Sequence, residues 1–291
     1  MQYQEDTWEF GQTFHDIRKN RNIPLKQVAD EEVSVSQLSR FERGESDLSV
    51  TKFMRALANM KVEIGEFVDV MYHHQRSENI AFMTQLVPLE YKRDIDGFRR
   101  LFEEQKDKYA ANPSVYQYHL NMILAQSFIC KCDETIPFPP EYLDEVADYL
   151  FSVEQWRIYE LILIGNLYLF FEIPLLHRMG QEIYHKSKET GENQKLAVVV
   201  LLNIFETCIQ RRETEYADYY REHLPEFLED ETKLYERNIY HFLLGLYEYQ
   251  TGQREHGMER MQQAITVYEW LGCENLANNY RTDCRKYTEK L

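Results

Sequence analysis

The chain has 291 residues, enough for two domains, and 44% of them are hydrophobic, which is typical of a globular protein. Its formal net charge of −16 excludes a protein that coats nucleic acid with a uniformly basic surface. It has no uninterrupted apolar run of membrane-spanning length and no basic segment followed by an apolar stretch at its start, so we expect no membrane span and no signal peptide.

Residues 1–71 show the periodicity of short amphipathic helices. Apolar residues at helical spacing indicate a first, a fourth and a fifth helix, and they are Phe10, Phe14 and Ile17, then Phe53, Leu57 and Met60, then Ile64, Phe67 and Val68. Pro24 is expected at the first position of a short second helix, where Leu25, Val28 and Ala29 would face inward. Ser49 is expected to cap the fourth helix.

Residues 33–44 carry the most informative pattern in the chain. A third helix is expected here, capped by Ser34 and stopped by Gly44, after a turn at residues 30–32. The apolar positions would face the core and the polar ones outward, and these are Val33, Leu38 and Phe41 inside and Ser36, Gln37 and Arg40 outside.

A DNA-reading helix needs this arrangement, because it must present short donors and acceptors and one arginine to base edges without bulk that blocks the groove. Arg40 suits guanine, whereas Arg43 and Lys26 suit phosphate. The candidate DNA contacts are Lys26, Gln27, Ser34, Ser36, Gln37, Arg40 and Arg43. The alternative is an ordinary solvated helix in a domain that does not bind DNA.

Charge distribution fits this interpretation locally. Residues 17–61 hold nine Lys/Arg against six Asp/Glu, whereas the rest of the chain is strongly acidic. DNA would meet one basic face and be repelled elsewhere. Because one such domain offers few phosphate contacts, we expect a homodimer on a two-fold DNA site.

A polar stretch at residues 72–79 is the expected linker to a second domain, residues 80–291. Helical periodicity continues there almost throughout, and no segment shows sustained strand alternation. Gly245, Gly252, Gly257 and Ala264 stand at the small-residue offsets of tetratricopeptide repeats. The fold class expected is therefore all-α, with five or six helical hairpins of roughly 35–40 residues after the DNA-reading domain.

Asparagines recur within apolar helices of this second domain. Asn121, Asn166, Asn203 and Asn238 are separated by 45, 37 and 35 residues, close to one repeat each. Each amide needs hydrogen-bond partners, which an extended peptide backbone or a neighbouring helix could supply. Arg157 could bind a peptide carboxylate or remain a surface arginine.

Residues 10–70 resemble the xenobiotic-response-element (lambda-repressor-like) helix-turn-helix, and the whole chain resembles the Rgg (Rgg/GadR/MutR) regulators, most strongly at residues 36–46. The resemblance implies a cytoplasmic, dimeric transcription factor, often switched by a short re-imported peptide. It also implies that Glu42 pairs with an arginine of the first helix, for which Arg18 is the candidate. Pro24 and Leu25 depart from the Ser-Gln of many members, whose glutamine often contacts DNA.

No catalytic constellation, phosphate loop or zinc-type cysteine spacing is present, so we expect no enzyme, no cofactor and no metal site. The five cysteines are odd in number and scattered, which favours reduced cytosolic thiols. Three other classes stay open: a dimeric regulator that responds to a metabolite or to no ligand, a protein-interaction scaffold, and, least favoured, an enzyme with a DNA-targeting domain.

Overall fold

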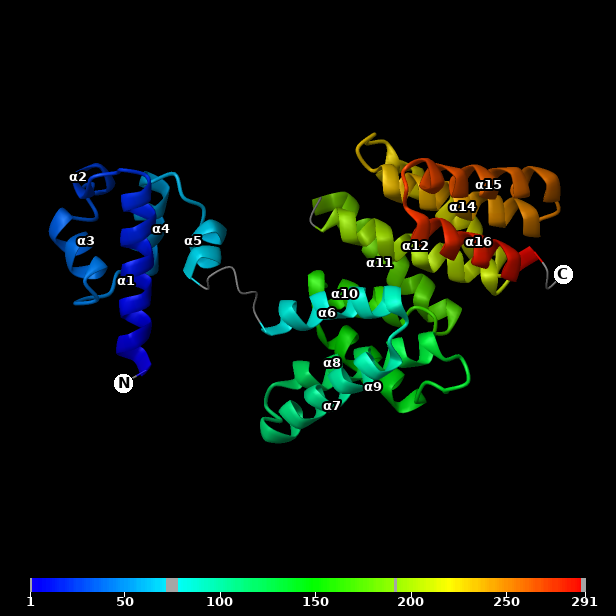
Figure 1. The fold of residues 1–291 in the computed structure, drawn as a ribbon, viewed down its shortest axis with the longest axis horizontal. Coiled ribbons are helices and arrows are strands. Elements are labelled where there is room, and N and C mark those ends of the chain that lie inside the picture. Colours follow the sequence, from blue (N-terminus) through cyan, green and yellow to red (C-terminus); the bar gives the residue numbers. More distant parts are fainter. Residues whose placement is uncertain (1, 72–77, 191–192, 289–291) are drawn as a thin grey trace. The chain divides into compact units, whose positions relative to one another are not determined.

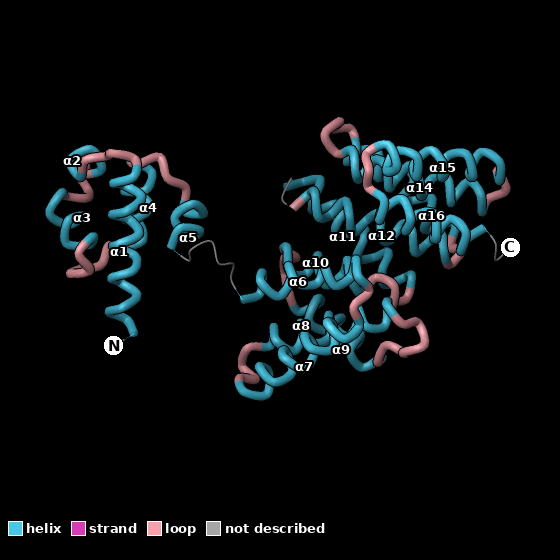
Figure 2. Tube along the Cα trace, viewed as in Figure 1, coloured by secondary structure: helices cyan, strands magenta, loops and turns pink. Residues whose placement is uncertain are grey.

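The computed structural model of the chain describes residues 2–71, 78–190 and 193–288, and within these ranges it consists of helices and loops (Figure 2). This confirms the all-α fold class. None of the described helices is both long and apolar enough to cross a bilayer. The chain divides into two compact units, Met1–Gln85 and Leu86–Leu291. Most of the predicted linker, residues 72–77, lies outside the described residues, and its last two residues begin helix α6 (Glu78–Lys92).

Five helices precede α6 in the first unit (Figure 1): α1 (Gln2–Asn20), α2 (Leu25–Val28), α3 (Val35–Glu42), α4 (Val50–Asn59) and α5 (Ile64–Met71). Helix α1 packs against α3 and α5, and α2 packs against α3 and α4. The order and approximate extent of these helices match the sequence-based expectation.

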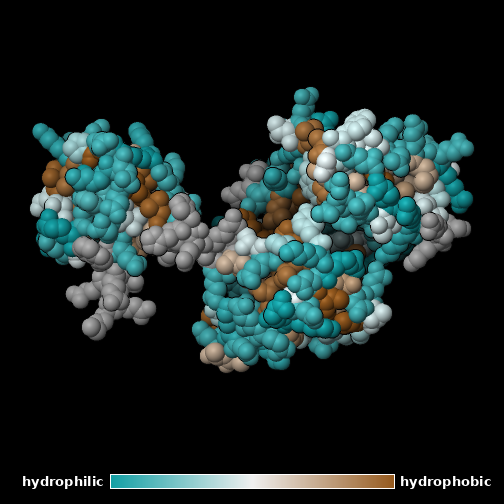
Figure 3. All heavy atoms as spheres, in the orientation of Figure 1, coloured by the Kyte–Doolittle hydropathy of each residue, from teal (hydrophilic) through white to brown (hydrophobic). Residues whose placement is uncertain are grey.

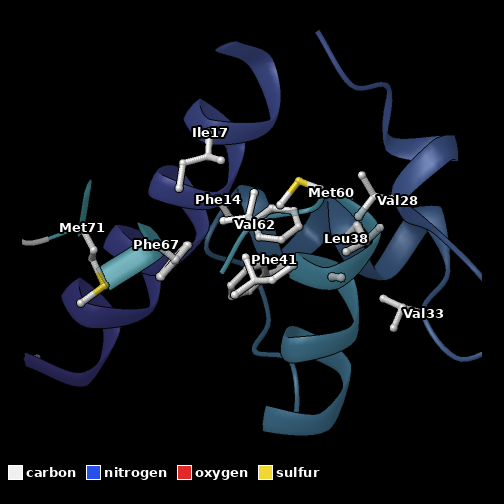
Figure 4. Close-up of a cluster of buried hydrophobic side chains, with 12 residues drawn as sticks. Phe14, Ile17, Val28, Val33, Leu38, Phe41, Met60, Val62, Phe67 and Met71 are labelled. Carbon is white, nitrogen blue, oxygen red and sulfur yellow. The ribbon is translucent and has the colours of Figure 1, made fainter. Parts of the chain in front are cut away.

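The core of the first unit forms where the apolar stripes of these helices meet (Figure 4). Its buried members are Phe14, Ile17, Val28, Val33, Leu38, Phe41, Ala56, Leu57, Met60, Val62, Phe67 and Met71. Half-buried Phe53 joins them through Phe67, with ring centroids 4.9 Å apart, and through Phe41, at 5.9 Å. Aromatic pairs at this separation add to the stabilisation that burial provides.

Three of the apolar residues that indicated the first and fifth helices are exposed. The relative exposures of Phe10, Ile64 and Val68 are 37%, 40% and 38%. Helix α5 buries Phe67 and Met71, which are one helical turn apart, so the Ile64–Val68 stripe is rotated away from the core by about 100°. In a helix of eight residues, two overlapping apolar stripes are present, and the sequence alone does not choose between them.

Helix termini were predicted well, with one error. The Ser49 hydroxyl accepts a hydrogen bond from the backbone N–H of Lys52 at 3.4 Å, so it caps α4 as expected. Pro24 is not the first helical residue. It is the N-cap of α2, with an extended backbone at ψ 147°, and its carbonyl accepts from the N–H of Gln27.

A buried ion pair ties α1 to α3, as the resemblance implied. Arg18 Nε and Nη2 donate to the two carboxylate oxygens of Glu42 at 2.6 and 2.8 Å. The third guanidinium nitrogen, Nη1, donates to the carbonyl of Ile23 at 2.8 Å. Both side chains are more than nine-tenths buried, so each charge is stabilised by its hydrogen-bonded partner rather than by water.

The second unit contains, after the end of α6, ten α-helices and one short 3-10 helix within the described residues: α7 (Ile95–Ala111), α8 (Tyr116–Cys132), α9 (Pro140–Ser152), α10 (Ile158–Leu167), α11 (Ile173–Thr190), α12 (Gln194–Gln210), α13 (Thr214–His223), η1 (Leu224–Leu228), α14 (Leu234–Gln250), α15 (Arg254–Trp270) and α16 (Glu274–Thr288). Alternate helices pack on one another, α8 on α10, α10 on α12 and α12 on α14. We call these four the inner helices. This is the packing of a tetratricopeptide-like array.

Gly245 and Gly257, two of the glycines at tetratricopeptide offsets, lie where two helices approach closely. A Cβ atom on Gly245 would lie 2.7 Å from the carbonyl oxygen of Gly257, and one on Gly257 would overlap the backbone of Gly245 and Tyr249. Helices α14 and α15 therefore approach at backbone distance only because neither position carries a side chain.

Helix α16 reaches back across the second unit. Lys286 Nζ lies 3.0 Å from Glu134 Oε1, although 152 residues separate them. Tyr287 of the same helix bonds Gln210 at the end of α12, and its hydroxyl lies 3.5 Å from Glu206 Oε1. The last helix thus contacts elements from the first half of the array. The viewed surface of this unit is mostly hydrophilic (Figure 3), in line with its 23 Lys/Arg against 35 Asp/Glu over residues 86–291.

We expect Glu42→Gln to destabilise the first unit by about 3 kcal/mol, because it leaves the buried Arg18 guanidinium without its counter-charge. Urea denaturation, with amide exchange in α1 and α3 as the reporter of this unit, measures the effect. Glu66→Gln is the matched control: it removes the exposed Arg21–Glu66 pair and should cost below about 1 kcal/mol. Equal losses in the two variants would contradict the assigned role of the buried pair.

Candidate functional site

Helix α3 begins with a reciprocal cap. The backbone N–H of Gln37 donates to Ser34 Oγ at 3.2 Å, and the backbone N–H of Ser34 donates to Gln37 Oε1 at 3.1 Å. Such a capping box satisfies two backbone donors at a helix start. Two predicted DNA contacts, Ser34 and Gln37, therefore also hold the start of the helix, and the amide nitrogen of Gln37 retains its donors.

The turn that joins α2 to α3 is held by Asp30. Its Oδ1 accepts from the backbone N–H groups of Glu32 and Val33 at 2.9 and 3.0 Å. Its Oδ2 accepts from Arg55 at 2.5 Å and Asn59 at 3.1 Å, both on α4. These bonds, that from Arg55 above all, hold the pKa of Asp30 well below its usual range. The angle between α2 and α3 is thus fixed by a charged side chain that stays ionised.

The predicted DNA contacts all lie on the exposed side of α2 and α3. Exposed residues include Lys26, Gln27, Ser34, Ser36, Gln37, Arg40 and Arg43. Arg40 has no hydrogen bond or ion pair to the part of the chain that the structure describes, so its five donors are available to a base edge. The structure leaves all seven side chains exposed, and their contact with DNA stays a prediction.

Arg43 is engaged. Its Nε and Nη2 donate to Glu45 Oε1 and Oε2 at 2.7 and 2.8 Å, and its Nη1 donates to Ser39 Oγ at 2.5 Å. The exposed pair raises the pKa of the Arg43 guanidinium and lowers the pKa of Glu45. The sequence contained Glu45 two residues after Arg43, but only the turn at Gly44, with φ +65°, directs the carboxylate back onto the arginine.

The four predicted peptide-binding asparagines lie one on each inner helix: Asn121 on α8, Asn166 on α10, Asn203 on α12 and Asn238 on α14. Asn121 and Asn238 are buried and bonded within the array. Asn121 Nδ2 donates to Gln105 Oε1 on α7 at 3.2 Å, and its Oδ1 accepts from the Tyr159 hydroxyl at 3.0 Å. Asn238 Nδ2 donates to the carbonyl of Ala264 on α15 at 3.0 Å. These two amides join helix to helix.

Asn166 and Asn203 are half-buried and lie at the junctions between inner helices. Asn203 Nδ2 donates to the carbonyl of Gly165 at 3.1 Å, and its Oδ1 has no bond among the described residues. Asn166 donates to the carbonyl of Ile162 at 2.8 Å and lies 3.5 Å from Lys131 Nζ on α8. The structure therefore brings Lys131, Asn166 and Asn203 together across α8, α10 and α12.

Arg157 lies apart from these asparagines, at the exposed N-cap of α10. Nine residues separate it from Asn166, a distance of about 13 Å along the helix. It borders a cavity of about 360 Å³ lined by Gln155, Trp156, Arg157, Leu161, Ile183, Lys186, Ser187, Glu189 and Asn193. The guanidinium has no bond to the described residues, so it can accept an anionic group there.

Sequence reasoning missed several polar side chains on the inner helices. Lys131 Nζ lies 4.6 and 5.4 Å from the ring centroids of Phe128 and Tyr168, and burial lowers its pKa to about 8. Glu206 on α12 accepts from Gln210 at 2.8 Å, and burial, reinforced by the Asp283 carboxylate, raises its pKa to about 7. A charged residue inside an otherwise apolar helix was the available signal for both.

The cysteines are not paired with one another in disulfides. All five are free, and no group of three or more potential metal-binding side chains occurs within the described ranges. Burial raises the pKa values of Cys130, Cys208 and Cys284, which keeps these thiols protonated. Cys273 is half-buried and lies in the turn before α16.

Residues 99–282, well over half of the chain, match the family model described as "HTH-type transcriptional regulator Rgg, C-terminal domain". The chain belongs to the Rgg family. It is a transcriptional regulator, and the family comprises regulators rather than enzymes.

Solved structures extend the likeness beyond the family model. This Rgg-family chain is 26% identical to the Streptococcus dysgalactiae SHP pheromone receptor Rgg2, with 95% of this chain and 99% of that chain covered and a TM-score of 0.78. The PrgX/cCF10 complex shares the fold at 14% identity, with coverages of 97% and 93% and a TM-score of 0.70. A bacterial peptide pheromone/receptor complex does so at 14% identity, with coverages of 96% and 98% and a TM-score of 0.71.

Because the folded-state pKa of Glu206 is raised from 4.5 to about 7, its contribution to stability is present below pH 4.5 and is lost as the pH rises through about 7. We expect Glu206→Gln to be more stable than the parent Rgg-family chain above pH 7, by up to about 3 kcal/mol, with the gain shrinking toward pH 5. Urea denaturation across this range measures it. The exposed Glu231→Gln should show no such pH-dependent difference, and a pH-independent effect of Glu206→Gln would contradict the assignment.

Proposed function

We propose that this regulator acts in the cytoplasm as a homodimer that binds a two-fold operator through α3, and that a short peptide held by the inner helices changes its transcriptional output. The observation that carries the proposal is the match of nearly the whole chain, both units included, to a structure described as an SHP pheromone receptor. At 26% identity over 95% of the chain, the likeness supports a common kind of effector rather than a common peptide.

The DNA half of the proposal rests on α3. Its start is capped, its position is held by the Arg18–Glu42 pair, and its exposed face carries Ser36, Gln37 and Arg40, which has no partner among the described residues. We assign Arg40 to guanine, through paired bonds to O6 and N7, and Lys26 and Arg43 to phosphate. Gln27, Ser34, Ser36 and Gln37 supply the remaining polar contacts.

The peptide half rests on the inner helices. Packed helices lie about 8–10 Å apart, so α8, α10 and α12 together extend over roughly 20 Å. An extended peptide of about eight residues covers some 26 Å, which is enough to cross all three. To the peptide backbone, Asn203 offers its Oδ1 as an acceptor, which has no bond within the described ranges. The amide of Asn166 and the ammonium of Lys131 offer donors.

Among the predicted residues, we assign peptide contact first to Asn166 and Asn203. Asn121 and Asn238 already bond neighbouring helices and would act through the shape of the array. Arg157 is assigned a peptide carboxylate or acidic side chain, because its guanidinium borders a cavity and lacks a partner within the described ranges.

Coupling requires that the peptide prefer one dimer geometry over another, since a ligand shifts an equilibrium only by its difference in affinity for the two states. A peptide that crosses three inner helices can change the curvature of the array, and with it the spacing or mobility of the two copies of α3.

We expect Arg40→Ala to lose about 10- to 100-fold in affinity for an operator selected from random duplex DNA, while the dimer stays intact. Gel-shift competition against non-specific DNA measures the loss of preference. Arg237→Ala removes an exposed, unpaired arginine from the second unit and should leave the preference unchanged. Unaltered sequence preference in Arg40→Ala would remove this residue from the base-reading set.

The variants Asn166→Ala and Asn203→Ala should bind operator DNA normally and lose the peptide response. Peptide binding is tested by native mass spectrometry after incubation with the peptide fraction of the host's spent medium. DNA binding is tested by operator gel shifts. The parent protein should carry an added mass of about one kilodalton per subunit, as expected for a peptide of some eight residues. Asn275→Ala, an exposed asparagine of α16, is the control. A full response in both inner-helix variants would place the peptide elsewhere.

A further inference from the structure

We infer that Glu45 occupies the phosphate-binding fork of Arg43 and so sets how tightly the DNA-reading domain grips the DNA backbone. The inference rests on the proposed DNA contact of α3 and adds an affinity-setting residue that makes no contact with DNA itself. Its basis is the exposed, paired geometry of Arg43, Glu45 and Ser39 at the end of α3.

The pairing occupies three of the five N–H donors of the guanidinium, among them the two of the Nε–Nη2 edge. An arginine fork binds a carboxylate and a phosphate through the same two parallel N–H donors, so one excludes the other. Glu45 takes Nε and Nη2, and Ser39 takes Nη1. A DNA phosphate that approaches the Nε–Nη2 edge of Arg43 therefore has to displace a carboxylate of the same chain, and it gains little net charge neutralisation in doing so.

The backbone turn presents Glu45 to this arginine. Gly44 adopts φ +65°, and the backbone N–H of Glu45 donates to the carbonyl of Arg40 at 2.9 Å. This ends α3 and directs the next residue back over its last turn. Glu45 is also near enough to Arg40 for that second arginine to contribute to the lowering of its pKa. One carboxylate thus counteracts both arginines of the recognition helix.

Helix stability does not account for Glu45. The C-terminal end of a helix carries partial negative charge, where a carboxylate is unfavourable and an arginine favourable. Arg43 is the C-cap residue of α3 and would suit that end without a partner. The position of Glu45 is therefore explained by its pairing with Arg43. This pairing deprives the domain of one phosphate contact.

The test compares Glu45→Gln with Asp47→Asn. Both remove one negative charge, and they lie two residues apart, but exposed Asp47 has no bond to the described residues and so frees no arginine when neutralised. Binding of the full chain to a short mixed-sequence duplex is measured by fluorescence anisotropy from about 50 to 200 mM salt. No operator is needed, because phosphate contacts do not depend on sequence.

The Glu45→Gln variant should bind the duplex about two- to five-fold more tightly per subunit. The plot of the logarithm of its DNA association constant against the logarithm of the salt concentration should steepen by about 0.9 per subunit, the effect of one added phosphate contact. Asp47→Asn should change affinity less and leave the slope unaltered. Glu45→Ala should repeat the gain, which guards against an effect peculiar to glutamine. In the Arg43→Ala background the gain should vanish.

Equal gains in Glu45→Gln and Asp47→Asn, or a gain that persists without Arg43, would overturn the inference and leave DNA binding intact. If the parent protein binds no duplex at the lowest salt and Arg40→Ala changes nothing, the proposed DNA-binding function fails, and this inference fails with it. The two failures are therefore distinguishable.

Discussion

The buried pair of Arg18 and Glu42 is the contact on which the DNA-reading unit depends. Helix α3 is only eight residues long and could not hold its own orientation, because isolated helices of this length are unstable in water. The pair binds it to α1 with two charge-assisted bonds in a site that excludes water. Ser36, Gln37 and Arg40 take their positions from this anchor, and the Asp30 turn and the Ser34 cap complete it.

A second constraint governs the array: every buried amide must find a partner. Asn121 and Asn238 meet it by bonding to helices α7 and α15, which stiffens the stack. Asn166 bonds the Ile162 carbonyl and Lys131, whereas Asn203 meets the requirement only in part, since its Oδ1 has no bond among the described residues. The same residue type at the same spacing thus serves two tasks, and the distinction lies in which neighbour the side chain reaches.

Local signals were sufficient for the recognition helix. Ser34, Gly44 and the inward stripe of Leu38 and Phe41 were predictable because caps, stops and helical periodicity depend on residues within a few positions. The Gly245–Gly257 approach was predictable because a repeat motif already encodes that distant contact. In α5, by contrast, two apolar stripes compete, and the packing of Phe67 against Phe53 and Phe10 on other helices goes with the burial of Phe67 rather than Ile64.

Contacts between distant segments that neither a repeat motif nor the family resemblance encodes were beyond sequence reasoning. The partners of Asn121 and Asn238, Gln105 and the Ala264 carbonyl, lie 16 and 26 residues away on other helices. The raised pKa of Glu206 results from burial, reinforced by the Asp283 carboxylate of α16, and nothing near Glu206 in the sequence indicates that carboxylate. The Arg43–Glu45 pair is close in sequence but depends on the left-handed Gly44, whose effect on side-chain direction has no signature in composition.

The return of α16 to earlier parts of the array has a consequence for how the second unit unfolds. Solenoids usually fray from their ends, because each repeat contacts only its neighbours. Here Lys286 reaches Glu134, and Tyr287 reaches the end of α12, so the terminal helix is tied to the first half of the stack. Fraying of α16 must break contacts with the middle of the array. The amide protection of α16 therefore follows the global unfolding of the unit rather than a local opening. The unit gains the cooperativity of a closed domain.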